Sequence, residues 1–309
     1  MRAGHAPLGR LWYRERIPVP AVREKRLKRR RIAALGAAVV LVWLCGSSAG
    51  SELRGLKGRI VFCSNRSGTW ALWTIGADGT GLRQLTRSNN GEKDVDPAFS
   101  PDGKQVLFTS TRGGKTGVWM MGADGARLKR LCDGGQAEWS ADGQSIVFAR
   151  NDRIHTRGLV DGKETAISPE DWLPCSGPAW SPDGKTIAFA ARSGGKNALY
   201  LVAATGGKPT KVYDKRGACE PHWSPDGTQL LYETETHVCR IRPDGTKNRY
   251  VTVHAGVQRY PRWSADGRHV VFCQGVSERG PWQLYTVPAR GGAPVKLTDR
   301  GSDMYPDWK

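Results

Sequence analysis

One short motif, an aromatic residue followed by Ser, Pro or Ala, Asp and Gly, recurs along the chain. Five full copies and a truncated sixth place the aromatic residue at Phe99, Trp139, Trp180, Trp223, Trp263 and Trp308. Successive aromatic positions are 40, 41, 43, 40 and 45 residues apart. A period of about 40–45 residues is typical of four-stranded propeller blades and is longer than a leucine-rich or ankyrin unit. The chain is therefore expected to fold as a series of blades.

The motif has the composition of a tight turn between two strands. Pro fixes φ at the first central position, Asp bonds to the local backbone, and Gly adopts the left-handed conformation. A β-rich segment follows each turn, for example Gln105–Ser110 (QVLFTS) and His269–Gln274 (HVVFCQ). A third strand, a second glycine turn and a short outer strand complete the unit. Each unit is thus predicted to be one four-stranded blade.

The two ends of the repeat region complement each other. The first unit, from Gly58, has second, third and outer strands but no first strand, whereas Met304–Lys309 has only a first strand. Residues 58–309 number 252, which is 42 for each of six blades. The sequence predicts an all-β fold, a six-bladed β-propeller closed by the C-terminal strand. Closure would hide the edges that an open array exposes.

A basic segment and an apolar segment precede the repeats. Residues 1–31 contain 11 Lys or Arg and two Glu, which accounts for half of the formal net charge of +18. Ile32–Cys45 is apolar, and small residues follow it. This order is typical of export signals and membrane anchors. We expect a basic cytoplasmic leader over 1–31, one hydrophobic helix over 32–50 that is either a cleaved signal or a membrane anchor, and a linker over 51–57.

The charge distribution removes the main argument for nucleic-acid binding, because half of the excess lies in the leader rather than on the repeats. We expect no nucleic-acid partner. The propeller over 58–309 is predicted to be exported across the cytoplasmic membrane, to a periplasmic or extracellular location, and to be monomeric.

The repeats W/F-S-P/A-D-G resemble the WD40-like (PD40) propeller repeats of the TolB family, which also form the gating propellers of prolyl oligopeptidases. The resemblance covers about four fifths of the chain. It implies the propeller fold. A protein or peptide partner in the cell envelope is expected separately, from the export signal and the polar channel residues described below. TolB proper carries an α/β domain before its propeller, whereas only 51–57 separate the apolar segment from the first blade here. We therefore expect a TolB-like propeller without that domain.

Motifs for catalysis and metal binding are scarce. The pattern G-x-S-x-G occurs at Gly46–Gly50, but it follows the apolar segment instead of lying between a strand and a helix. The six His are scattered and lack the spacing of metal ligands. We expect no catalytic residue, no metal and no cofactor.

Six cysteines follow the apolar segment, an even number that permits disulfides in an exported domain. Cys63 and Cys273 occupy the same position of the repeat, at the end of a hydrophobic second strand, and we interpret them as buried thiols. Cys175 and Cys219 lie on consecutive blades, five and four residues before the motif Trp. A disulfide between these two is an open alternative.

Function is expected to depend on positions that differ between blades, because the constant ones serve every blade alike. The first strand of each blade adjoins the channel. Two positions on this strand differ between blades, the third residue and the first residue before the motif aromatic. Both are polar in three consecutive blades, but in another blade they are Gly177 and Ala179. The candidate binding residues are Glu220, His222, Tyr260, Arg262, Tyr305 and Asp307.

These side chains predict a recognition site at the channel mouth for a protein, a peptide or a small polar ligand, because Arg and Tyr supply anchoring contacts and carboxylates accept hydrogen bonds. We therefore predict a non-catalytic, envelope-associated binding or scaffold propeller. One alternative is a channel-mouth enzyme such as a polyuronate lyase, indicated only by Glu220-Pro221-His222. Another is a gating propeller that works with a separate hydrolase. The same residues could also form a solvated rim of mutually satisfied charges.

Overall fold

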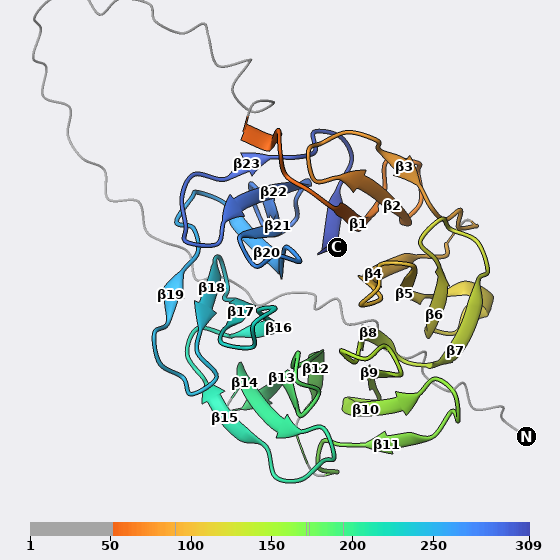
Figure 1. The fold of residues 1–309 in the computed structure, drawn as a ribbon, viewed down its shortest axis with the longest axis vertical. Helices are drawn as coiled ribbons and strands as arrows, with labels where there is room; N and C mark the ends of the chain where they lie inside the picture. The colour runs from red at the N-terminus through yellow and green to blue at the C-terminus, as the bar shows by residue number, and fades with distance from the viewer. Residues whose placement is uncertain (1–51, 90, 171, 173, 194) are drawn as a thin grey trace, which may run out of the picture. The chain divides into compact units, whose positions relative to one another are not determined.

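The computed structural model of the protein describes residues 52–89, 91–170, 172, 174–193 and 195–309. In this part of the chain, six four-stranded antiparallel sheets stand around a central axis (Figure 1). The predicted six-bladed all-β propeller is confirmed. The predicted leader and hydrophobic helix lie outside the described residues. Among the described residues, no helix has the length and apolar character needed to span a bilayer.

Blade one joins the two ends of the ring, as the sequence predicted. Its strands, from the channel outward, are β24 (Asp303–Trp308), β1 (Arg59–Ser64), β2 (Ala71–Gly76) and β3 (Arg83–Gln84). β24 runs antiparallel to β1, with Trp308 opposite Ile60 in the register. The last strand of the ring therefore supplies the channel-facing strand of the first blade.

The other five blades are continuous in sequence, and each begins at the channel and ends at the outer edge. A short 3-10 helix, Arg112–Gly114, lies between the second and third strands of blade two. The strands are, for blade two, β4 (Asp94–Phe99), β5 (Gln105–Ser110), β6 (Gly117–Gly122) and β7 (Lys129–Asp133); for blade three, β8 (Gly135–Trp139), β9 (Ser145–Arg150), β10 (Arg153–Gly158) and β11 (Glu164–Ala166); for blade four, β12 (Cys175–Trp180), β13 (Thr186–Ser193), β14 (Lys196–Ala203) and β15 (Thr210–Tyr213); for blade five, β16 (Cys219–Trp223), β17 (Leu230–Glu233), β18 (Val238–Ile241) and β19 (Arg249–Tyr250); for blade six, β20 (Val257–Trp263), β21 (His269–Gly275), β22 (Trp282–Pro288) and β23 (Val295–Lys296).

The repeated motif forms the same turn in each full copy. In blade two, the Ser100 hydroxyl donates to Asp102 Oδ1 at 2.6 Å, and the same oxygen accepts the amide of Lys104 at 3.0 Å. The Ser100 hydroxyl in turn accepts the amide of Gln105, the first residue of β5, at 2.9 Å. The Ser–Asp bond recurs at 2.6 Å in the other four copies. Constant Ser and Asp are thus explained by the turn alone.

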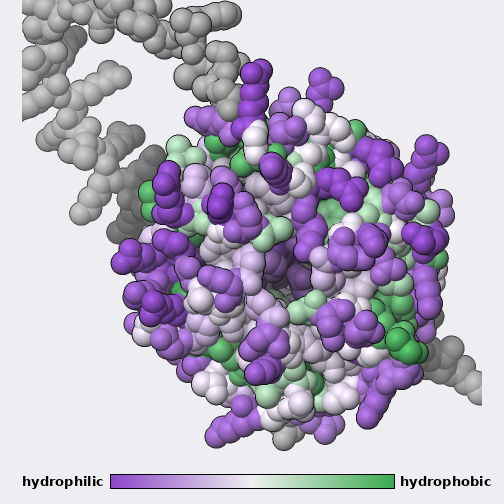
Figure 2. Space-filling model, in the orientation of Figure 1, coloured by the Kyte–Doolittle hydropathy of each residue, from purple (hydrophilic) through white to green (hydrophobic). Residues whose placement is uncertain are grey.

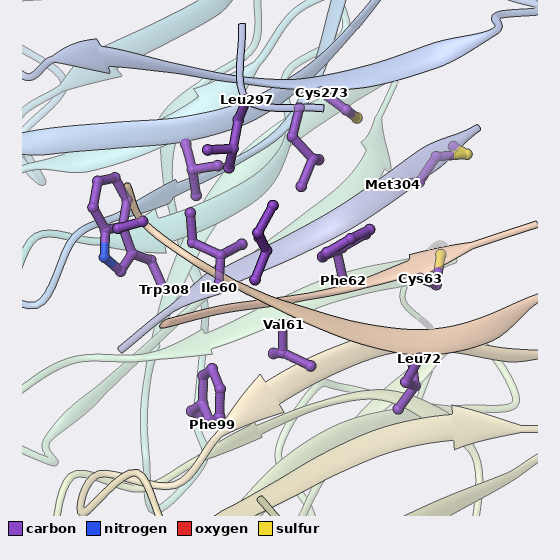
Figure 3. Close-up of a cluster of buried hydrophobic side chains, with 14 of the residues drawn as sticks. Ile60, Val61, Phe62, Cys63, Leu72, Phe99, Cys273, Leu297, Met304 and Trp308 are labelled. Atoms are coloured by element: carbon purple, nitrogen blue, oxygen red, sulfur yellow. The ribbon is translucent and has the colours of Figure 1, made fainter. Parts of the chain in front are cut away.

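Several motif Trp side chains connect neighbouring blades. Trp139 Nε1 of blade three donates to the carbonyl of Ala98 in blade two at 3.1 Å, and blade five bonds to blade four in the same way. Trp308 is 4% exposed and belongs to a hydrophobic cluster shared by blades six, one and two. Figure 3 shows it in that cluster together with Ile60 of β1 and Leu297, which follows β23. The ring is therefore held together by side chains between blades.

The interpretation of Cys63 and Cys273 as buried thiols is confirmed. Cys63 and Cys273 are fully buried free thiols on the second strands of blades one and six. Cys219 is also a free thiol and donates to Glu233 Oε1 at 3.3 Å. The alternative disulfide between Cys175 and Cys219 is therefore not formed.

Replacing Trp308 should loosen the closure. Trp308→Ala removes a buried ring between blades, and we expect a loss of about 3–5 kcal/mol in the free energy of unfolding. Urea unfolding followed by Trp fluorescence measures this loss. Trp180→Ala is the matched control, because Trp180 is only partly buried and its Nε1 bonds to Gly184 within its own turn. Equal losses in the two variants would contradict the special role of Trp308.

Candidate binding site in the central channel

Each channel-facing strand contains one extra residue relative to its neighbour. In blade two, Val95 and Ala98 are paired with Thr109 and Leu107, so three steps on β4 oppose two on β5. This two-against-one pattern is a β-bulge, and the same shift occurs on all six inner strands. At the bulge, φ lies between 51° and 55° in Asp96, Gln136, Gly177, Glu220, Tyr260 and Tyr305.

A left-handed backbone is unfavourable for residues other than glycine, and such residues cluster at functional sites. Five of the six bulge positions nevertheless carry a side chain. The amide of a bulge residue can be bonded by the preceding blade: Gln136 N donates to Thr109 Oγ1 at 2.9 Å, and Tyr260 N donates to Glu233 Oε2 at 2.6 Å. The bulges therefore hold six variable positions in one repeated geometry.

A narrow cavity lies in the channel, lined by five of the bulge residues and by residues next to them. Figure 2 shows a hollow near the centre of the visible face, with hydrophilic residues around it. Acidic side chains predominate in the lining, where the only cation is Arg262. The cavity is lined by Asp96, Pro97, Ala98, Gln136, Ala137, Glu138, Gly177, Pro178, Glu220, Pro221, Arg262 and Tyr305.

The structure brings three of the six predicted residues, Glu220, Arg262 and Tyr305, to the cavity wall. The ring of Tyr260 packs against that of Tyr305, with centroids 3.9 Å apart and the ring planes tilted by 36°. Tyr260 itself, Asp307 and His222 lie outside the lining. Asp307 is 9% exposed and its Oδ2 accepts the amide of Phe99 at 2.7 Å, so this carboxylate joins blades one and two. His222 is partly buried, and its Nδ1 has no hydrogen-bond partner among the described residues.

Blade three also contributes channel residues. The sequence prediction left them out because it took residues only from the consecutive blades five, six and one. Arg262 Nη2 on β20 lies 3.2 Å from Glu138 Oε1 on β8, so this ion pair spans the channel between opposite blades. Gln136 Nε2 donates to Glu220 Oε1 at 3.4 Å, and Gln136 Oε1 accepts the amide of Gly177 at 3.1 Å. Gln136 and Glu138 occupy the same two positions of the repeat as the predicted residues, so the repeat alignment could have identified them.

Burial raises the pKa values of the carboxyl groups in the channel. It raises the pKa of Asp96 to about 6 and that of Glu138 to about 7, although Arg262 opposes both shifts. The pKa of Glu220 is raised to about 8, first by burial and then by the negative charge of Glu233. Burial acts to lower the pKa of Arg262, but the surrounding carboxylates outweigh it and raise that pKa. The cavity lining thus holds three carboxyl groups with raised pKa values and one guanidinium group that stays charged.

His222 contributes no positive charge at neutral pH, because burial, assisted by Arg262, holds its pKa well below the ordinary value. Within the described part of the chain, no group of three or more His, Cys, Asp or Glu side chains has the arrangement of a metal site. The chemistry that the site offers is hydrogen-bond acceptance, an aromatic wall and attraction for a cation.

The Ser-Asp turns, the inter-blade Trp and the bulged channel strands define a six-bladed propeller with a polar channel. The sequence matches the family described as the TolB beta propeller domain over residues 55–169 and 154–275. These matches cover more than half of the chain, which belongs to this family.

Individual relatives share part of the chain. A TolB homologue of Chlorobium luteolum is 31% identical over 43% of this chain and 32% of its own length. An uncharacterised protein of Agrobacterium fabrum is 30% identical over 55% of this chain and 59% of its own length. The aligned region thus spans between about a third and three fifths of these relatives.

Solved structures with the same fold include TolB from Acinetobacter baumannii, with a TM-score of 0.70 and 18% identity over 81% of this chain and 66% of that one. An oligogalacturonate lyase in complex with manganese has a TM-score of 0.51 and 17% identity over 80% of this chain and 74% of that one. At such identities these likenesses establish the fold.

The raised pKa of Glu220 predicts a pH dependence of stability. In the folded chain Glu220 keeps its proton up to about pH 8, whereas an unfolded Glu with a pKa of 4.5 has lost it. The folded state then binds more protons, so this group makes the free energy of unfolding fall as the pH rises between those two values. Glu220→Gln removes the contribution and should flatten the decline.

Urea unfolding at about pH 5 and about pH 8 measures the decline. Glu235→Gln serves as the control, because Glu235 is exposed and lies outside the cavity lining; it should follow the wild-type profile. If Glu220→Gln also follows that profile, the buried state of the Glu220 carboxyl is refuted.

Proposed function

We propose that the protein is an exported, envelope-associated binding propeller that receives a positively charged segment of a partner protein in its channel, without catalysis. The observation that carries the proposal is the charge composition of the cavity. Asp96, Glu138 and Glu220 line it together with a single cation, Arg262, which is already paired with Glu138. A Lys, Arg or N-terminal ammonium group entering the channel would meet the carboxyl groups of Asp96 and Glu220, which form no ion pair among the described residues.

The aromatic pair adds a second kind of contact. Tyr260 and Tyr305 come from neighbouring blades six and one, and their rings pack against each other at a tilt. Tyrosine is enriched among residues that dominate binding energy, because it offers a large rigid surface and a polar tip. Tyr260 and Tyr305 can therefore anchor an apolar or cationic side chain beside the carboxylates.

The family relationship supports a protein partner. A Tol-Pal system protein TolB of Francisella tularensis is 30% identical over 91 residues, which is 28% of this chain and 21% of its length. The basic leader predicted over 1–31 and the apolar segment over 32–50 support a location of the propeller on the far side of the cytoplasmic membrane.

Two alternatives find less support. A polyuronate is a polyanion, and the cavity lining offers it a single cation, Arg262, which is already paired with Glu138. A gating role beside a separate hydrolase draws on similarity to an uncharacterised peptidase of Bacillus subtilis, 31% identical over 41% of this chain and 19% of its own length. Binding of a cationic segment accounts for the channel residues directly.

The partner can be identified by site-specific photocrosslinking in the native envelope. A benzophenone amino acid replaces Tyr305 at the cavity, and in the control it replaces Val160, which is 90% exposed. A protein captured only from the Tyr305 position is the candidate partner. Capture from both positions, or from Val160 alone, would argue against the channel.

Affinity for the purified partner then tests the residues. Tyr305→Ala and Glu220→Gln should each weaken binding by roughly 1–2 kcal/mol, measured by isothermal titration calorimetry. Ala179→Ser is the control, because it lies on the inner strand of blade four and is outside the cavity lining. Unchanged affinity in the Tyr305→Ala/Glu220→Gln double variant would exclude the channel as the binding site.

A further inference from the structure

Positive side chains gather at the outer edge of blade five. Figure 1 places β18 and β19 at the periphery of the ring, and in Figure 2 the margin of the molecule there is strongly hydrophilic. We call Arg216, Arg240, Lys247 and Arg249, with Tyr250, the basic edge. None of the ion pairs found among the described residues includes any of its four cations.

Two of these cations lie opposite each other on neighbouring strands. Arg240 on β18 is directly opposite Arg249 on β19, and like charges in this relation destabilise a strand pair. In blade two, the residue that corresponds to Arg249 is Lys129, and the uncharged Met120 lies opposite it. The repulsion is thus a particular property of blade five, and an external anion placed between the two guanidinium groups would relieve it.

The basic edge also exposes apolar groups. Tyr250 is 42% exposed, and the guanidinium of Arg216 lies 5.7 Å from the centre of its ring. Three residues further along the chain, Val253 is 76% exposed. Cations that flank an exposed aromatic ring and an aliphatic side chain are typical of surfaces that lie on a lipid headgroup layer. The outer edge of a propeller is convex, a shape that suits a flat layer better than a small ligand.

We propose that the basic edge binds a bilayer surface of acidic phospholipids. Arg216, Arg240, Lys247 and Arg249 contact the phosphates, and the Tyr250 ring lies at the level of the headgroups. This surface is separate from the channel and goes beyond the proposed binding of a cationic partner segment. With an outer blade edge on the membrane, the channel axis runs along the bilayer plane and both channel mouths stay open to a partner.

Hydrogen–deuterium exchange of the full chain tests the proposal, because it reports each segment separately. Protection at the basic edge can therefore be distinguished from any contact that residues 32–50 make with the vesicles. The probes are vesicles of phosphatidylcholine alone and vesicles with roughly one third phosphatidylglycerol. We expect amides within 246–255 to exchange on the order of tenfold more slowly with the acidic vesicles, and this protection to disappear in about 1 M salt.

The matched variants use equivalent positions of two blades. Lys247 and Arg127 are both exposed and both left-handed, with φ of 52° and 59°. Lys247→Asn/Arg249→Gln should abolish the protection, whereas Arg127→Asn/Lys129→Gln, which removes the same charge from blade two, should keep it. Asn tolerates the left-handed backbone, so both variants should fold, which their thermal unfolding verifies.

Protection by phosphatidylcholine vesicles alone, protection confined to other segments, or equal loss in both variants would overturn the proposal. Protection by soluble polyglutamate without protection by acidic vesicles would also overturn it, in favour of an acidic protein partner.

Discussion

The pairing of β24 with β1 is the contact on which the other features of the molecule depend. It brings Trp308 opposite Ile60 and Asp307 opposite Val61, across more than 240 residues of chain. Beside the strand pair, Arg66 Nη2 bonds to the fully buried Asp303 at 2.7 Å. Only with this pairing do six inner strands surround the axis, so that side chains on opposite blades can meet in one narrow cavity. The hydrophobic cluster of blades six, one and two then has no exposed edge.

The channel combines several locally unfavourable features. Left-handed residues, buried carboxyl groups with raised pKa values and a buried Arg262 Nε without a partner each destabilise the folded chain. In the channel all three features occur together, where the six blades converge, while the Ser–Asp turn keeps the same geometry in every full copy of the motif. Such a division, with a regular framework around a strained polar centre, is expected when the framework provides stability and the centre provides recognition.

The repeat predicted the fold because its signals are local. Turn residues, strand length and the complementary ends are all read directly from short segments, and closure follows from counting them. The candidate site was predicted less completely. The repeat alignment identified which positions of each blade face the channel. It did not show that Arg262 pairs with Glu138, 124 residues earlier in the chain, because which side chains meet depends on the width of the channel. The bulges were also missed, although Pro follows the bulge residue in five of six blades, as after Tyr305, and Pro cannot donate to a strand ladder.

The position of β24 in the sequence has a consequence for biosynthesis. Tyr305, which lines the cavity, belongs to the last strand of the ring to leave the ribosome and to cross a membrane if the chain is exported. A growing or truncated chain therefore has an open ring and an incomplete cavity, with β1 unpaired on its channel side. The cavity is therefore complete only in a chain whose β24 has joined β1, so a partner that bound in the channel would select closed rings over open ones.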